Sequence, residues 1–228
     1  MSKAQLKLDW CTHEAAKYAV EHWHYSKRMP MPPLVKVGAW EDGKYVGCIL
    51  FSRGASPHLG TAYGLTQTEC CELTRVALTS HATPVSRVLA LSVRFLRRTS
   101  PGLRLIVSFA DTAEGHHGGI YQGAGWTYTG LSTDVVEYFH EGRWKHTREM
   151  IGGAFGGAAV NKSIAARCPT RTRPGKHRYL LPLDAAMRAQ LAPLAKPYPK
   201  RVQDPRVGKS SPVGTTTGEG GALPTPTL

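Results

Sequence analysis

The stretch DTAEGHHGGIYQGAGW, residues 111–126, combines groups that exchange protons with an unusual share of glycine. An aspartate, two adjacent histidines and a tyrosine lie among five glycines, directly after the apolar run LRLIVSFA. Functional groups of α/β proteins gather at the carboxyl ends of strands, and glycine lets the backbone approach a ligand closely. We therefore take Asp111 as a candidate site residue. The alternative from residue type alone is that Asp111 caps a helical turn and Tyr121 packs in the core.

A second group of chemically useful side chains lies in HWHYSKR, residues 22–28. His24 offers an acid–base group and Tyr25 a ring, which together suit recognition of a base extruded from a nucleic acid. Lys27 and Arg28 offer contacts to phosphate. His22 and His24 also present two nitrogens to a transition metal such as iron. The simpler interpretation of two histidines without a third ligand is a polar helix surface.

Two arginines follow or interrupt apolar strand sequences. Arg75 lies inside ELTRVAL, and strict alternation places it on one face with Leu73 and Ala77. An arginine in a central strand must be paired or face a cleft, so we expect it to anchor a cofactor phosphate or a site carboxylate. An ion pair with Glu72 or Glu69 is the structural alternative. Arg53, which ends the strand before it, is a second candidate at the mouth of such a cleft, where we expect it to contact DNA.

The charge of the chain indicates a polyanionic partner. It has 29 Lys and Arg against 16 Asp and Glu, a net charge of +13, which favours nucleic acid. A segment from Arg143 to Arg178 holds nine basic residues and one acid, Glu149. We predict that Arg171, Arg173 and Lys176 bind the DNA backbone; a solvated basic surface is the alternative. The nine are Arg143, Lys145, Arg148, Lys162, Arg167, Arg171, Arg173, Lys176 and Arg178.

The elements that must position these residues alternate between helix and strand. Helix-period apolar residues follow a possible Thr12 cap, and a hairpin is expected over 34–52 with its turn at residues 41–43. TPVSRVLALSVRFLRR is the clearest helix, with Thr83 as cap and Pro84 at its first position. Strands are predicted around ECCELTRVAL, LRLIVSFAD, WTYTG, DVVEYFHEGRWKH and KHRYLLPL.

Composition bounds the rest of the molecule. Residues 1–183 are predicted to form one domain, and residues 184–228 a basic, then Pro/Gly/Thr-rich, disordered tail. No apolar run is long enough for a membrane span, and no secretory signal is visible. Five cysteines without a C-x-x-C pair indicate reduced thiols. We therefore expect a cytoplasmic protein.

The order of elements resembles the GNAT acyltransferase superfamily, in which a mixed, mostly antiparallel sheet flanked by helices holds acyl-CoA. The resemblance implies a cofactor contact at the helix after the central strand, here TSHATPVSR, residues 79–87, with Ser86 and Arg87 as candidate ligands. That stretch lacks the superfamily's glycines, although a helix N-terminus still offers amides to an anion. The superfamily also implies that Tyr121 protonates a leaving thiolate.

Five motifs in order resemble one subgroup, the phage Mu Mom family of DNA-modification enzymes. They are HWHYSKRMP, GCILFSRGA, ELTRVAL, VSRVLAL and SFADTAEGHHGGIYQGAGWTYTG, and the resemblance covers about residues 15–180. It implies transfer of a carbamoylmethyl (acetamido) group to N6 of adenine in duplex DNA, which protects phage DNA from host restriction. The adenine would be flipped out of the helix, with Asp111 accepting a hydrogen bond or proton from N6. Simple acetyl transfer cannot yield this substituent, so another metabolite or further chemistry is required.

Two other functions fit parts of the sequence. An ordinary GNAT N-acetyltransferase acting on an amine, a protein or RNA would share the fold but should show the glycine loop. A non-enzymatic, basic DNA-binding protein would share the charge but would not need His24, Tyr25, Arg75, Asp111 and Tyr121 to converge. An enzyme requires these five groups to line one cleft.

Overall fold

A seven-stranded sheet forms the centre of the protein, which a computed structural model describes over residues 4–151 and 162–200. Neighbouring strands are antiparallel except β4 and β5, which are parallel, so the predicted mixed, mostly antiparallel sheet is confirmed. Across the sheet the order is β1 (Leu6–Trp10), β2 (Leu34–Glu41), β3 (Lys44–Ser52), β4 (Cys70–Leu78), β5 (Leu105–Ala110), β10 (His177–Pro182) and β6 (Thr127–Leu131).

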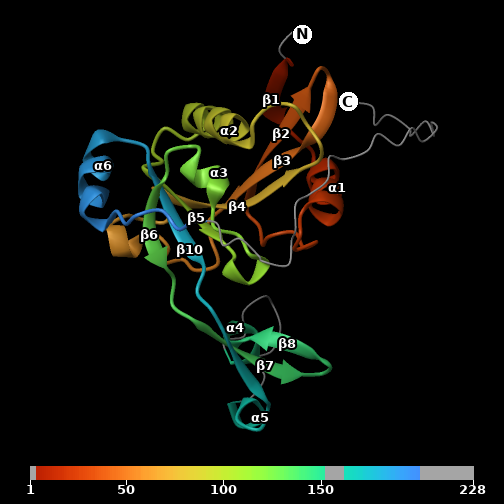
Figure 1. The fold of residues 1–228 in the computed structure, drawn as a ribbon, viewed down its shortest axis with the longest axis vertical. Helices are drawn as coiled ribbons and strands as arrows, with labels where there is room; N and C mark the ends of the chain where they lie inside the picture. The colour runs from red at the N-terminus through yellow and green to blue at the C-terminus, as the bar shows by residue number, and fades with distance from the viewer. Residues whose placement is uncertain (1–3, 152–161, 201–228) are drawn as a thin grey trace, which may run out of the picture.

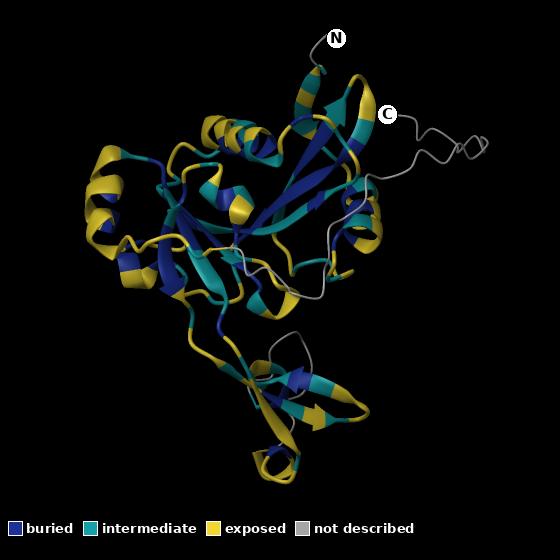
Figure 2. Ribbon diagram, viewed as in Figure 1, coloured by how far each residue is buried: buried dark blue, intermediate teal, exposed yellow. Residues whose placement is uncertain are grey.

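Helices cover both faces of this sheet (Figure 1). The amphipathic α2 (Val85–Thr99) connects β4 to β5 and buries its apolar stripe against one face, in a core that includes Ile106 and Trp126. On the other face, α1 (His13–Trp23) packs its alanines on β3 and β4, and α6 (Ala185–Leu191) packs beside β5 and β10. The sheet between the helices is mostly buried, as Figure 2 shows.

Local sequence signals explain most element boundaries. Thr12 caps α1 as predicted, its hydroxyl accepting from the Ala15 amide at 3.1 Å. The β2–β3 hairpin turns at Asp42 and Gly43, both with positive φ, as a type I′ turn requires. Thr83 does not cap α2: its hydroxyl instead donates to the Glu41 carboxylate at 2.6 Å, because a charged oxygen is the stronger acceptor.

A bulge in β4 overturns the predicted alternation of its side chains. Leu50 pairs with Arg75 but Phe51 pairs with Leu73, which leaves Thr74 as an extra residue. Leu73 therefore packs in the core under α2, while Ala77 packs under α1 on the opposite face. Arg75 shares the α1 face with Ala77, not with Leu73 as strict alternation predicted.

Residues 132–151 and 162–176 lie outside the central sheet, between β6 and β10 in the chain, and form a separate lobe (Figure 1). Its three-stranded antiparallel sheet has the order β8 (Arg143–His146), β7 (Val135–His140), β9 (Thr170–Arg173). Two short helices, α4 (Thr147–Met150) and α5 (Lys162–Ala165), complete the described part of the lobe. Residues 152–161 lie outside the described part of the chain.

The chain remains ordered beyond the predicted domain end at residue 183. Asp184 caps α6 by accepting from the Met187 amide at 2.7 Å, and the segment that follows returns across β6, where the Lys196 amide donates to the Tyr128 carbonyl. Residues 201–228 of the predicted tail lie outside the described part. None of the helices described is both long and apolar enough to cross a bilayer. The remaining short helices are η1 (Thr61–Tyr63), η2 (Thr112–Glu114), α3 (Gly119–Gln122) and η4 (Ala192–Leu194).

Candidate active site

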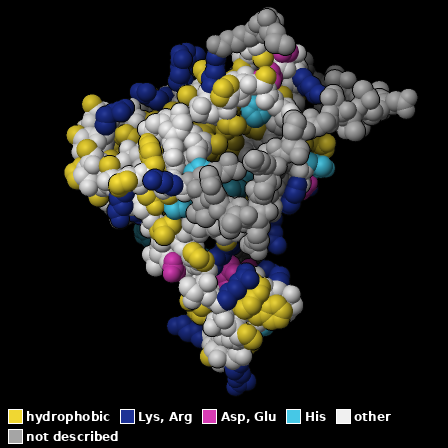
Figure 3. Space-filling model, viewed as in Figure 1, with side chains coloured by type: hydrophobic (Ala, Val, Ile, Leu, Met, Phe, Trp, Pro, Cys, Tyr) yellow, Lys and Arg dark blue, Asp and Glu magenta, His cyan; other side chains and the backbone are white. Residues whose placement is uncertain are grey.

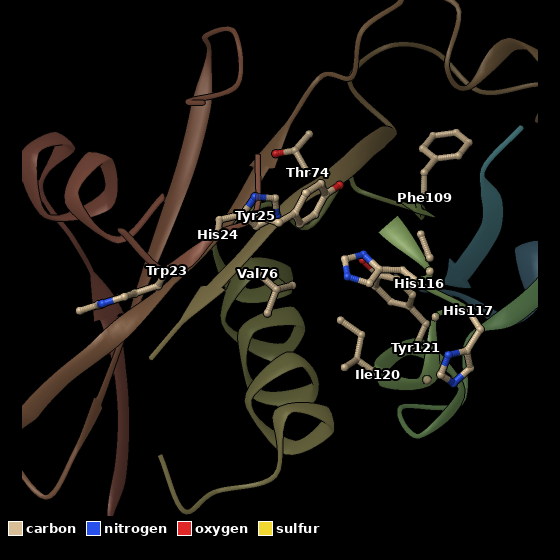
Figure 4. A pocket seen from close by; sticks show the side chains of 14 residues that line it. Trp23, His24, Tyr25, Thr74, Val76, Phe109, His116, His117, Ile120 and Tyr121 are labelled. Atoms are coloured by element: carbon tan, nitrogen blue, oxygen red, sulfur yellow. The ribbon is translucent and has the colours of Figure 1, made fainter. Parts of the chain in front are cut away.

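A cavity of about 650 Å³ lies where the two parallel strands part. β4 and β5 pair only from Cys70 to Leu73 and from Leu105 to Ser108, and residues of both strands beyond this point form part of the cavity lining. Figure 4 shows His24 and Tyr25 on one side of it and His116, Ile120 and Tyr121 on the other. Its volume is typical of a small-molecule site. The cavity is lined by Trp23, His24, Tyr25, Thr74, Val76, Phe109, Ala110, Gly115, His116, His117, Gly118, Gly119, Ile120 and Tyr121.

Tyr121 is fixed at the parting point of the strands by Ser108. The fully buried Ser108 hydroxyl lies 2.8 Å from the Tyr121 hydroxyl and 2.8 Å from the Leu73 carbonyl, to which it donates. Burial raises the pKa of Tyr121 to about 12, so the phenol keeps its proton at neutral pH. Sequence reasoning missed Ser108; its signal was the single hydroxyl in the apolar run LIVSFA.

His24 is a neutral hydrogen-bond donor. Its Nδ1 lies 3.1 Å from the Ser26 backbone amide and 2.8 Å from the Ser26 hydroxyl. Because an amide can only donate, Nδ1 accepts, and the proton of the neutral ring is assigned to Nε2. Burial and then the positive charge of Arg75 lower the pKa of His24 to about 4. At neutral pH it therefore offers an N–H group to a ligand rather than a basic nitrogen.

Aromatic rings from two distant segments meet at the cavity. The Tyr25 ring, 44% exposed, lies 4.3 Å from the His24 ring and 5.0 Å, edge to face, from the His116 ring. Gly118 has a φ of +79°, and a Cβ there would lie 2.2 Å from the Tyr179 ring, so only glycine fits. The glycine-rich stretch therefore brings backbone against the core while it presents His116 toward Tyr25.

Asp111 does not line the cavity but anchors the lobe beside it. Its carboxylate, 3% exposed, accepts from Arg173 and Lys176 at 2.9 Å each and from the Ala113 amide at 3.1 Å. Burial alone would raise its pKa, but the hydrogen bond and charge of Lys176 and the charge of Arg173 outweigh burial and hold the pKa below its usual value. The capping role considered from the sequence is present. The carboxylate expected to take a proton is instead fully engaged as an anion.

Of the two candidate arginines, one lies near the cavity. Arg75 donates to the backbone carbonyls of Thr74 at 2.7 Å and Arg28 at 3.3 Å, and thus ties β4 to the loop after Tyr25. Within residues 4–151 and 162–200 it forms no ion pair, although the half-buried Glu72 is close enough to affect its pKa. Arg53 lines a different cavity of about 300 Å³, at the start of β4, so the expectation that it stands at the cleft mouth is not met.

The loop before α2 already holds a carboxylate from the protein itself. Glu41 accepts from the amides of Ala82 and Thr83 at 2.7 and 2.8 Å, and the Thr83 hydroxyl and these amides lower its pKa. Ser86 lies against Gly123 at the end of α3, and Arg87 is exposed to solvent. With no glycine and two amides occupied, this loop does not fit the pyrophosphate of an acyl-CoA as the superfamily resemblance implied.

The residues predicted to contact DNA occupy two settings. Lys27 and Arg28 are exposed beside Tyr25, and Lys27 donates to the His22 carbonyl at 2.6 Å. Arg171, Arg173 and Lys176 lie in the lobe and at its root, and all three form ion pairs with Glu137 or Asp111. Their charges are therefore partly compensated, and DNA binding by them stays a prediction.

The geometry does not support a metal at His22 and His24. His22 stacks on Tyr18 with Nδ1 2.8 Å from the Tyr18 carbonyl, while Nδ1 of His24 is held by Ser26. Among the residues placed in the structure, no group of three or more His, Cys, Asp or Glu side chains could hold a metal ion. The expectation of an iron site is not supported.

Comparison with known proteins gives one family and several solved structures. The Mom protein family matches residues 5–200. No curated protein is significantly similar to the chain. The structure is similar to aminoglycoside acetyltransferase AAC(6')-Ib, solved with coenzyme A and kanamycin (10% identity, 82% of this chain, 99% of that chain, TM-score 0.48). It is also similar to the N-acyl amino acid synthase FeeM from uncultured soil microbes (12%, 83%, 97%, 0.46) and the AHL synthase LasI (12%, 87%, 100%, 0.43).

Proposed function

The chain belongs to the Mom protein family, and we propose that it is a transferase that adds a carbamoylmethyl group to N6 of adenine in duplex DNA. The observation that carries the proposal is the cavity between the parted strands, which a neutral histidine donor and a protonated tyrosine line together. A phage that encodes this activity would protect its DNA from restriction endonucleases of the host.

The cavity offers what an extruded adenine needs. A flipped base is stabilised by stacking on rings and by hydrogen bonds to its edge. Tyr25 and His116 supply rings at the cavity, and Nε2–H of His24 supplies a donor for a ring nitrogen of adenine. Exposed Lys27 and Arg28 lie beside these rings and suit the flanking phosphates.

Proton transfers in the reaction are assigned from the protonation states. N6 is a weak nucleophile because its lone pair is delocalised into the ring, so its proton leaves late in the attack. The acceptor of that proton is the Tyr121 phenolate, which forms when Tyr121 protonates the leaving group and which thereby regains its proton. Tyr121 holds a proton that it can give to the leaving group of the donor. Asp111 is not assigned the role of base, because Arg173 and Lys176 occupy its carboxylate. We assign it the positioning of the lobe beside the cavity.

The transferred group is bonded to N6 through a methylene carbon, so the donor must carry a carbamoylmethyl group whose leaving group departs from that carbon, and it need not be held by a pyrophosphate at α2. Glu41 fills the amides that would otherwise receive an anion there. Together with the lack of glycine in residues 79–87, these occupied amides favour the proposal over an ordinary acyl-CoA-dependent acetyltransferase, for which the superfamily resemblance implies a glycine loop.

The proposal is tested by protection of DNA in cells. Plasmid DNA from cells that express the chain should resist a restriction endonuclease that is sensitive to adenine modification, whereas plasmid from cells that express Tyr121→Phe should be cut. Full cleavage of both plasmids, with both proteins folded and present, would contradict the proposed function.

A further inference from the structure

One face of the lobe carries an arranged set of aromatic and arginine side chains. Alternation along the strands places Glu137 and Phe139 of β7 on this face. Their cross-strand partners there are Arg171 on β9 and Trp144 on β8. We call Phe139, Trp144 and Arg171 the aromatic face of the lobe. Val136 lies on the opposite face, opposite Thr172.

The side chains of the aromatic face contact one another and are partly open to solvent. The rings of Phe139 and Trp144 lie 5.3 Å apart, edge to face, and the Arg171 guanidinium lies 4.4 Å from the Trp144 ring centre. Glu137 fixes that guanidinium through bonds of 2.8 and 2.7 Å. Phe139 nevertheless remains 41% exposed. Figure 3 shows hydrophobic side chains gathered on the lobe next to Lys and Arg side chains.

The aromatic face is joined to the candidate active site by ion pairs. Arg173 lies 3.6 Å from Glu137 and 2.9 Å from Asp111, and Asp111 directly follows Ala110, which lines the cavity. Phe139 lies two residues beyond Glu137 along β7, a distance of about 7 Å.

The charge of the lobe fits a polyanion. Residues 132–176 hold eight Lys and Arg against four Asp and Glu. Three of the four acids, Glu137, Glu141 and Glu149, are bound by cations of the same lobe. An exposed apolar face surrounded by positive charge suits the bases and phosphates of nucleic acid. It suits less well a protein partner whose surface is apolar and carries no acidic residues.

We propose that Phe139 and Trp144, with Arg171 behind them, form a stacking surface for DNA bases that are unstacked close to the target adenine. This inference rests on the proposed function, because it takes duplex DNA as the substrate. The lobe then supplies base contacts, and not only contacts to the backbone.

The test is binding of a duplex oligonucleotide that carries 2-aminopurine next to the target adenine. Phe139→Ala and Phe139→Leu should weaken binding about 5- to 150-fold, the range for loss of one base–aromatic stack, and should reduce the rise in 2-aminopurine fluorescence. Phe139→Trp should restore both. The dependence of affinity on salt should keep its slope, because no cation is removed. Val136→Ala is the matched control, since Val136 is also 41% exposed, and should bind like the wild type.

Each remaining outcome overturns the inference. Wild-type affinity in Phe139→Ala would show that the aromatic face does not bind DNA bases. The face would then bind another partner, such as a second copy of the chain, and light scattering would detect that association. Equal losses in Phe139→Ala and Val136→Ala, or a fall in the salt slope, would indicate general damage to the lobe. The proposed function fails separately: it fails if wild-type protein binds this duplex but leaves no modified adenine.

Discussion

Replacing Asp111 with asparagine separates its two candidate roles. The substitution keeps the shape of the side chain and an oxygen that can accept from the Ala113 amide, but it removes the charge that binds Arg173 and Lys176. A hydrogen bond to a charged group contributes about 1.5–3 kcal/mol. Arg173 and Lys176 are 30% and 43% exposed, so water partly replaces the lost partner. We therefore take the lower end for each bond and expect a loss of about 3 kcal/mol in the free energy of unfolding.

The loss should be visible in thermal melting. For a chain of this size, 1 kcal/mol corresponds to about 2–4 °C, so Asp111→Asn should melt about 6–12 °C below the wild type. The effect should depend on pH with a defined sign. Because the pKa of Asp111 is lowered in the folded protein, its contribution is present above the pKa of the unfolded chain, about 3.9, and disappears as pH falls through the folded value.

Asp134→Asn is the control, because Asp134 is exposed and accepts a single amide, that of Gly175, at 2.8 Å. It should change the stability by less than about 1 kcal/mol. Wild-type stability of Asp111→Asn combined with lost modification would refute the anchoring role. It would indicate that Asp111 acts on the substrate instead.

Three further predictions concern the cavity. Tyr121→Phe should keep the melting temperature within a few degrees, because the ring remains and Ser108 still donates to Leu73, but should lower the modification rate about 10²- to 10⁴-fold; an unchanged rate in a nucleoside assay would remove the tyrosine proton from the mechanism. His24→Gln should retain more activity than His24→Leu, because glutamine also places an N–H donor there; equal loss in both variants would favour a basic nitrogen. Burial lowers the pKa of His24 in the folded state to about 4, below the ordinary histidine pKa of about 6.5. The wild type should therefore lose stability relative to His24→Gln as the pH falls from about 6.5 toward 4. Parallel curves of stability against pH for the two proteins would contradict the burial argument.

Local signals in the sequence predicted the framework of the site well. Periodicity, caps and turn residues located α1, α2 and the β2–β3 hairpin. The family motifs contain His24, Tyr25 and Tyr121, which line one cavity in the structure. The helices and the hairpin depend on residues that are near in sequence. The family motifs stand for a known fold, in which distant segments are already paired. The prediction of the fold class was correct for the same reason.

Features that depend on distant partners were not predictable. The bulge at Thr74 depends on the register of β3 against β4, and it moved Arg75 to the other face. Asp111 is bound by cations more than 60 residues later in the chain. Glu41 accepts a hydrogen bond from Thr83, which lies 42 residues later. A side chain's type was visible in each case, but whether its charge was free or already paired was not.

The most direct test of the central claim is mass analysis of nucleosides from DNA of cells that express this chain. The proposed function predicts a deoxyadenosine that carries a carbamoylmethyl group on N6, present with the wild type and absent with Tyr121→Phe at equal protein levels. DNA that contains only unmodified deoxyadenosine in the presence of folded wild-type protein would contradict it.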